Sequence, residues 1–290
     1  MSLLPIALIL ISCFMHAGWN LLAKHRRQEL LFMRRMLLVA VPGALVLIGV
    51  GLLLPHSFPL RAWMCVIPSG LICGFYFLFL ALAYGSSDFS VVYPVARALP
   101  VLVVAGIDVL RGHNPSAIGW VGMFLVAGGC VLAPQHSYRE LHIKHYAGRA
   151  IMWILLTAGT IVAFTMLDKL AAEAVRQGPG SALIYCALFH IGACTSYSIL
   201  WAFCRPEPVE QGPGWTGPAV AALLGLGGYS LVLWAYQLSP HTGYLLAFRQ
   251  FSIVLGVVVA LRFYREKGVA VRLPATLAIV AGLVMLALWG

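Results

Sequence analysis

The sequence predicts an all-α membrane protein whose ten transmembrane helices form two inverted five-helix repeats. Of its 290 residues, 61% are hydrophobic and only 10% are charged, and the mean hydropathy is +0.92. A soluble domain carries about 25% charged residues, so this chain has too few to cover a water-facing surface. Apolar runs close to the roughly 20 residues of a membrane-spanning helix follow one another along the whole chain. A short pattern also recurs after a shift of 152 residues, which indicates an internal repeat.

The apolar runs define ten segments, each long enough for a helix to span a bilayer. The strands of a transmembrane barrel are shorter and alternate apolar with polar residues, and the sequence lacks that alternation. The predicted segments are residues 3–23, 36–54, 62–84, 89–110, 116–133, 150–170, 181–203, 218–238, 241–263 and 271–289.

Polar and proline-rich stretches separate these segments. Residues 55–59 begin and end with proline after the second segment, and residues 205–213 contain three prolines after the seventh. The longest polar stretch, residues 134–149, lies at the midpoint. It predicts a first five-helix repeat at 1–133 and a second at 150–290, with 134–149 as the linker between them. The short connections leave no room for a soluble domain.

The distribution of basic residues predicts the orientation of the helices. The odd-numbered connections and their flanks hold 13 of the 19 Lys and Arg residues, whereas the even-numbered connections hold 4. Because basic loops stay in the cytoplasm, both termini are predicted to lie outside it, in a protein of the cell inner membrane. Five helices in each half make the halves cross the membrane in opposite directions. Inverted repeats of this kind place a substrate site between the halves, near the bilayer midplane.

The formal net charge of +10 does not indicate a nucleic-acid partner. The basic residues occupy short loops, where topology and anionic lipid explain them, and no nucleic-acid-binding motif accompanies them. The seven cysteines contain no C-x-x-C pair and are expected to be buried thiols. Cys186, His190 and Cys194 are spaced four residues apart, but three side chains along one straight helix cannot reach a single ion. We therefore expect no metal and no cofactor.

Two arginines lie inside predicted helices and are related by the internal repeat. A shift of 152 residues carries Ala83, Tyr84, Ser87 and Arg97 onto Ala235, Tyr236, Ser239 and Arg249. A charged residue inside a membrane span is costly, so it usually faces the bundle interior and a partner. The pair could bind a carboxylate or phosphate of a solute, or each arginine could tie helix carbonyls or an internal aspartate. Asp108 lies about 16 Å along the helix from Arg97 and cannot be its direct partner, which leaves Asp88 and Asp168.

A polar stripe on the first predicted helix supplies further candidate solute-binding residues. His16, Asn20 and Lys24 are spaced four residues apart and share one face, with Trp19 beside it. The stripe could line a polar pathway. Alternatively, Lys24 reaches the membrane interface and His16 makes an ordinary interhelical hydrogen bond.

Tyrosines of the third, fourth and eighth segments could add an aromatic wall to the same pathway. Tyr76, Tyr93 and Tyr229 are the candidates for contact with a solute. Tyr84 and Tyr236 lie nearer to predicted helix ends, where interfacial aromatic belts are common. Pro94, inside the fourth segment, predicts a kink or a hinge.

Five stretches resemble, in order and spacing, the signatures of one branch of the EamA family, in the drug/metabolite transporter superfamily. They are His16-Ala-Gly-Trp-Asn20 with Lys24, Tyr93-Pro-Val-Ala-Arg97, Thr165 to Lys169, Phe248-Arg-Gln-Phe-Ser252, and Glu266. The resemblance implies ten helices in two inverted repeats around a central cavity, and transport of small organic solutes. Gln250 departs from the family's glutamate beside the arginine, and His113-Asn114 stand where the first repeat would have Gly-Glu. The first departure removes a candidate carboxylate for ion coupling, while Gln250 itself remains a candidate solute-binding residue.

Together these features predict a membrane transporter rather than an enzyme, acting on an anionic or zwitterionic metabolite such as an amino acid. Export by alternating access is the expected activity. Asp88 and Asp168 are the candidates for ion coupling, with exchange and facilitated transport as alternatives. A different class, an intramembrane enzyme, would need a nucleophile with its base or paired aspartates, and a receptor or assembly factor would move no solute. The expected partners are the lipid bilayer and a small-molecule solute, for a monomer or homodimer.

Overall fold

Eleven helices make up the part of the chain that the structure, a computed structural model, describes. The described residues are 2–24, 29–86, 89–133, 135, 137, 149–204, 214–262 and 269–290, and none of them lies in a strand. The helices are α1 (Leu3–Lys24), α2 (Glu29–Leu53), α3 (Leu60–Ser86), α4 (Phe89–Leu110), α5 (Ala117–Leu132), α6 (Arg149–Ala174), α7 (Pro179–Cys204), α8 (Thr216–Leu238), α9 (Thr242–Arg249), α10 (Phe251–Arg262) and α11 (Val269–Trp289).

The second helix begins earlier than its apolar pattern predicts, at Glu29 rather than at residue 36. Two arginines of this first part of α2 are covered by aromatic rings. The guanidinium carbon of Arg34 lies 4.7 Å from the ring centre of Trp201, and that of Arg35 lies 5.0 Å from the ring centre of Trp215. Both charges thus have an aromatic partner, and the helix includes them.

The predicted segment at 241–263 contains two helices instead of one. The first, α9, ends at Arg249, and α10 begins at Phe251, so that Gln250 forms a turn between them. By contrast, α4 is continuous from Phe89 to Leu110, through the position of Pro94. Of these two segments, the one that is interrupted is the ninth, at Gln250, and a kink or hinge at Pro94 stays a prediction.

Eight helices in the described part of the chain are long and apolar enough to cross a membrane. They comprise α1, α2, α3, α6, α7, α8 and α11, with α9 and α10 counting together as residues Thr242–Val259. Helix α5 is apolar but shorter, with 16 residues. Large apolar side chains face outward, as a lipid-exposed surface requires, and Leu3, Leu53, Phe203 and Leu110 are each more than 80% exposed. The fold is thus that of a multi-pass membrane protein, and a full set of ten spans stays a prediction.

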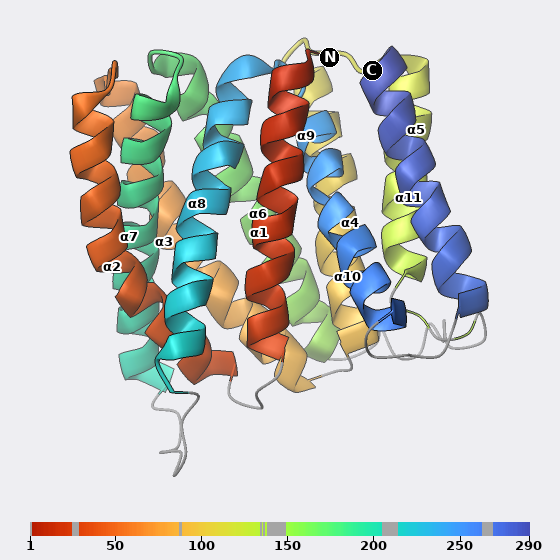
Figure 1. The fold of residues 1–290 in the computed structure, drawn as a ribbon, viewed down its shortest axis with the longest axis horizontal. Helices are drawn as coiled ribbons and strands as arrows, with labels where there is room; N and C mark the ends of the chain where they lie inside the picture. Colours follow the sequence, from red (N-terminus) through yellow and green to blue (C-terminus); the bar gives the residue numbers. More distant parts are fainter. Residues whose placement is uncertain are drawn as a thin grey trace.

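The helices pack chiefly in pairs that join the first half of the chain to the second. Helix α3 packs on α6 and α7, α1 on α8, α2 on α7, and α5 on α11. Figure 1 shows α2 and α7 at one side of the bundle and α5 and α11 at the other, with both chain termini at the same end. The middle of the bundle is formed by α1, α3, α4, α6, α8 and α9, and these helices surround the site together with part of α7.

Glycines allow the closest of these contacts. A Cβ atom added to Gly70 of α3 would lie 2.8 Å from the Phe189 carbonyl oxygen and 3.1 Å from the Gly192 Cα of α7. A Cβ added to Gly122 of α5 would lie 2.9 Å from the Gly282 carbonyl oxygen of α11. Helices in lipid depend on such close backbone packing, because no hydrophobic force drives them together.

Candidate functional site

A cavity of about 90 Å³ lies in the middle of the bundle, between helices of both halves. Its wall combines polar side chains with aromatic ones, which is typical of a site for a small organic molecule. The polar wall residues include Ser12, His16, Arg97, His190, Arg249 and Gln250. The aromatic ones are Trp19, Tyr76, Phe77, Phe164, Phe189 and Tyr229.

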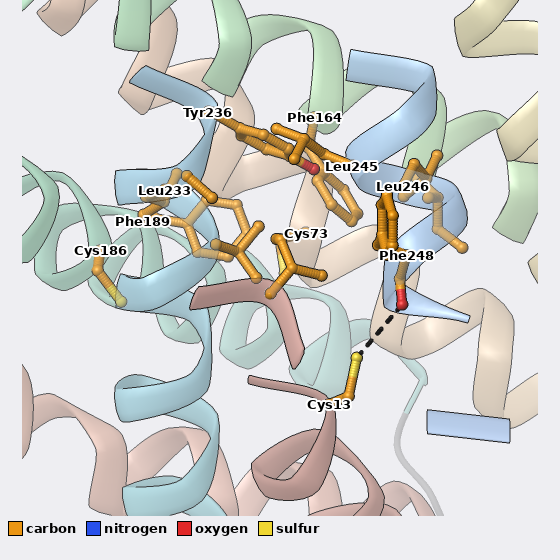
Figure 2. Packing of buried hydrophobic residues seen from close by; sticks show 14 of the residues in the cluster. Cys13, Cys73, Phe164, Cys186, Phe189, Leu233, Tyr236, Leu245, Leu246 and Phe248 are labelled. Carbon is orange, nitrogen blue, oxygen red and sulfur yellow. Dashed lines mark hydrogen bonds between the residues drawn. The ribbon is translucent and has the colours of Figure 1, made fainter. Parts of the chain in front are cut away.

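The break between α9 and α10 lies against this cavity. The Gln250 N–H donates to the Ala247 carbonyl at 2.9 Å, and the Ile253 N–H donates to the Gln250 carbonyl at 2.8 Å, so the backbone tightens into a turn. The Cys13 thiol of α1 lies 3.5 Å from the carbonyl oxygens of Phe248 and Arg249. Figure 2 shows the Cys13 sulfur pointing at the Phe248 oxygen. The thiol offers a donor to the irregular backbone, which inside a membrane is tolerated only within protein or beside a cavity.

Arg97 reaches from α4 to this turn. Its Nε donates to the side-chain oxygen of Gln250 at 3.1 Å, and its Nη2 donates to the Ser252 hydroxyl at 3.2 Å. Gln250 and Ser252 directly follow Arg249 in the chain, so these bonds bring Arg97 close to Arg249. Both repeat-related arginines line the same cavity. The sequence predicts both arginines but contains no signal that Gln250 and Ser252 contact Arg97.

Arg249 lies over an aromatic ring. Its guanidinium carbon is 5.6 Å from the ring centre of Tyr229, which stacks on Phe189 with 4.6 Å between the ring centres. In the described part of the chain, no carboxylate forms an ion pair with Arg249. The C-terminal end of α9 at Arg249 and the N-terminal end of α10 at Phe251 carry opposite partial charges, so the positive charge here comes from the guanidinium groups. This wall of the cavity is therefore positive and suited to an anionic group.

Asp168 lies behind the cavity wall, where three hydroxyl groups donate to its carboxylate. They belong to Ser69 of α3, Tyr185 of α7, at 2.8 Å, and Tyr229 of α8. The side chain is completely buried. Since Tyr229 also contacts Arg249, Asp168 is connected to the cavity through a single tyrosine.

The predicted polar stripe on α1 divides into two parts. His16 and Trp19 line the cavity, and the Trp19 indole N–H donates to His16 Nδ1 at 3.0 Å. Asn20 is not among the residues that line this cavity. Its amide donates to the His16 carbonyl of the same helix at 2.7 Å. The side chain of Lys24 lies outside the described residues.

Of three further predicted site residues between positions 76 and 93, the structure places one in the cavity wall. Tyr76 lines the cavity beside Phe164, with 5.8 Å between the ring centres. Asp88 and the side chain of Tyr93 lie outside the described residues.

The sequence does not single out His190 and Phe189 as cavity residues. The spacing of Cys186, His190 and Cys194 suggests only a metal site, and the described residues contain no group of three His, Cys, Asp or Glu side chains that could hold a metal ion. The structure instead places His190 in the cavity wall, with its Nδ1 at 2.8 Å from the Cys186 carbonyl oxygen. A histidine far from any loop in an apolar helix is the one signal that could have identified it.

A charged cluster joins α4, α6, α8 and α9 at one end of the bundle. Arg111 donates to both carboxylate oxygens of Glu173, at 2.6 and 2.7 Å. Lys169 lies 3.3 Å from Glu173 and donates to the carbonyls of Tyr236 and Ser239 at the end of α8. Asp108, at 3.8 Å from Arg111, accepts from the Gly243 N–H at 2.7 Å. This cluster is separate from the cavity wall and holds helix ends together.

Comparison with known proteins gives a family for the first half of the chain and a fold for nearly all of it. The family described as the EamA-like transporter family matches residues 3–133, which confirms the resemblance for this part of the chain, where the motifs at His16 and Tyr93 lie. No curated protein matches the chain. A crystal structure of a protein of unstated function is similar over 98% of this chain and 97% of its own, with a TM-score of 0.69 and 14% sequence identity. That similarity shows a shared fold.

Proposed function

We propose that this chain, whose first half matches the EamA-like transporter family, transports a small anionic or zwitterionic solute across the cell inner membrane. The observation that carries the proposal is the position of Arg249 in the cavity wall, without a carboxylate ion partner in the described part of the chain. A guanidinium at membrane depth is costly, and the aromatic contact of Arg249 with Tyr229 leaves its charge without a counter-ion among the described residues. An incoming carboxylate or phosphate would supply that counter-ion, with planar, paired hydrogen bonds.

The packing of the helices supports two repeats related by a twofold axis. The shift of 152 residues carries α1, α2 and α3 onto α6, α7 and α8, carries α4 onto α9 and α10, and carries α5 onto α11. If the two halves are exchanged, the α3–α6 contact becomes the α8–α1 contact, while the α2–α7 and α5–α11 contacts map onto themselves. All of these contacts are among the main packings of the bundle. We therefore retain residues 1–133 and 150–290 as two inverted repeats with the linker between them.

The helix break at Gln250 supports alternating access around the cavity. Discontinuous helices in transporters place backbone ends at the substrate site near the membrane midplane. Here α9 and α10 can change their relative angle at one turn, while Arg97 is held to that turn through Gln250 and Ser252. Rocking of the halves would expose the arginines first to one side of the membrane and then to the other. Export, with both termini outside the cytoplasm, is the direction that we expect.

Asp168 is our candidate for ion coupling in the described part of the chain. The same shift of 152 residues carries His16 onto Asp168, so the two repeats hold titratable groups at equivalent places. Asp168 acts on the cavity through Tyr229, which binds its carboxylate and lies beneath Arg249. A proton on Asp168 would change the hydrogen bond that positions this ring.

Transport can be tested with purified protein in liposomes. A thermal-shift screen with amino acids, monocarboxylates, organic phosphates and cationic drugs selects a solute, and its labelled form is then followed across the membrane. We expect Arg249→Ala to abolish flux, while Arg61→Ala, a change of an exposed arginine at the start of α3, leaves flux unchanged. Full transport by Arg249→Ala, or stabilisation by cations alone, would contradict the proposal.

A further inference from the structure

Two histidines line the cavity from different helices, and each has one ring nitrogen with an unambiguous partner. His16 belongs to α1 and His190 to α7. A neutral imidazole carries a proton on one nitrogen and accepts a hydrogen bond with the other. A partner that can only donate, or only accept, therefore assigns both nitrogens of the ring.

His190 is bonded to a group that can only accept. Its Nδ1 lies 2.8 Å from the carbonyl oxygen of Cys186, one turn earlier in α7. The Cys186 thiol is also 3.5 Å from Nδ1, but it donates to the Leu226 carbonyl at 3.4 Å, so the carbonyl oxygen is the closer partner of Nδ1. Nδ1 must therefore carry the proton, and Nε2 of the neutral ring is an acceptor. The ring is fixed between Phe189, with 5.4 Å between ring centres, and Tyr229, at 6.1 Å and nearly perpendicular. Because Nδ1 faces its own helix, Nε2 is the nitrogen available to the cavity.

His16 is bonded to a group that can only donate. The Trp19 indole Nε1 lies 3.0 Å from His16 Nδ1. Nδ1 must therefore accept, and the proton of the neutral ring is on Nε2. In a doubly protonated ring, the Nδ1–H would point at the indole N–H of Trp19. The perpendicular ring of Trp19, 5.1 Å away, holds this arrangement. His16 thus presents an N–H donor.

The two histidines consequently have opposite roles in one cavity. His16 adds a donor to those of Arg97 and Arg249, whereas His190 offers an acceptor. Arg249 and His190 both contact the ring of Tyr229, so one small molecule can reach both. An unpaired acceptor in a buried wall penalises any ligand that cannot donate to it.

We infer that His190 determines specificity, by selecting solutes that combine an anionic group with an N–H or O–H donor over anions that can only accept. The anionic group binds Arg97 and Arg249, and the donor binds His190 Nε2. An acceptor-only analogue leaves His190 unpaired and also brings its own oxygen against Nε2. This inference rests on the proposed function, since it concerns the solute of the same cavity.

Matched triads of ligands test the inference. One triad is leucine, 2-hydroxyisocaproate and 2-oxoisocaproate, and a second is 4-aminobutanoate, 4-hydroxybutanoate and 4-oxobutanoate. Within each triad the carboxylate and the carbon chain are constant, while the second group changes from ammonium to hydroxyl to carbonyl, and the hydroxyl and oxo compounds also have the same net charge. Binding is measured on the purified protein by thermal shift and by tryptophan fluorescence. In at least one triad, we expect the amine and the hydroxyl compound to bind about tenfold or more tightly than the oxo compound.

Variants of the histidines separate a specific role from a structural one. In His190→Gln, the amide can donate to the Cys186 carbonyl and still accept from the ligand, so the preference should persist. In His190→Leu, the preference should disappear, with at least part of the affinity for the oxo compound retained. His56→Leu is the matched control, because His56 Nδ1 also lies 2.8 Å from a backbone carbonyl, that of Leu54, but on the exposed surface.

Each outcome has a distinct meaning. Equal binding of all three members of each triad overturns the inference about His190 and leaves the transport proposal standing. A preference that survives in His190→Leu overturns the inference as well. Absence of binding by every anionic compound, with response to cationic drugs only, overturns the proposed function together with it.

Discussion

Arg97 of α4 donates its Nε hydrogen to the side-chain oxygen of Gln250, 3.1 Å away, at the turn where α9 ends and α10 begins. An amide oxygen positions a guanidinium without carrying a charge of its own. The resemblance to the EamA family implies a glutamate at the position after Arg249, and this chain has Gln250 there instead. The departure at Gln250 is therefore also a contact of the candidate solute site.

Gln250→Glu should weaken anion binding while the bundle stays folded. The new carboxylate would pair with Arg97, and a solute anion would have to compete with it. We expect a loss of about tenfold or more in affinity for the transported anion, measured by thermal shift at constant ionic strength. Gln177→Glu, on the surface, is the control and should bind normally. Unchanged affinity in Gln250→Glu would show that Arg97 does not contact the solute.

Tyr229→Phe and Tyr185→Phe form a matched pair. Each removes one hydroxyl that donates to Asp168, but only Tyr229 lines the cavity and lies beneath Arg249. Both variants should lose about 1–3 kcal/mol of stability, because a buried carboxylate loses a donor. Only Tyr229→Phe should also change solute affinity, by several-fold, since its ring is no longer tied to Asp168. Chemical denaturation and ligand titration measure the two effects separately, and an equal effect of both variants on affinity would contradict this assignment.

Asp168→Asn should preserve the fold and abolish any dependence of flux on a proton gradient. The asparagine side-chain oxygen can still accept from Ser69 and Tyr185, so the local structure has partners. It cannot gain or lose a proton in the physiological range. Counterflow exchange of the solute, which needs no gradient, should persist in the variant. If gradient-driven accumulation in liposomes is the same as in the unaltered protein, Asp168 is not the coupling group.

Arg111→Gln should destabilise the end of the bundle without altering the cavity. The change removes the paired bonds to Glu173, which is exposed, and the charge near Asp108, which is buried. We expect a loss of about 1–2 kcal/mol, reduced by the partial exposure of the pair to solvent. Thermal unfolding monitors this loss, and Arg176→Gln, a change of an exposed arginine, should have no measurable effect. A large loss of solute affinity in Arg111→Gln would instead place the cluster on the transport path.

The charged cluster also shows where prediction from the sequence stops. Lys169 appears in the sequence only as part of a motif, and Asp108 only as a residue too distant to pair with Arg97. In the structure Lys169 binds carbonyls at the end of α8, and Asp108 caps the start of α9 through Gly243. These partners come from helices more than 60 residues away along the chain, so no local pattern could assign them.

His190 illustrates the same limit within the cavity. Its spacing from Cys186 and Cys194 is visible in the sequence, but three side chains along one straight helix cannot reach a single metal ion. The cavity position of His190 depends on where α7 meets α8, which places its ring against Tyr229. Conversely, Asn20 lies on the same face of α1 as His16, but its amide hydrogen-bonds to the backbone of its own helix. The spacing of residues along a helix shows which face they share, and does not show what each side chain contacts.

By itself, the sequence determined the helical membrane class, the approximate ends of most helices and the presence of Arg97 and Arg249 inside them. Each of these follows from properties of the chain that need no tertiary contact, namely the length of the apolar runs and the free-energy cost of a charge in lipid. Only the tertiary structure decided that the ninth segment breaks at Gln250, where Cys13 of α1 can supply a donor to the interrupted backbone. It also decided that Gln250 and Ser252 bind Arg97 and that Tyr229 joins Arg249 to Asp168. These relationships join side chains from distant parts of the chain, and their geometry exists only once the helices are packed.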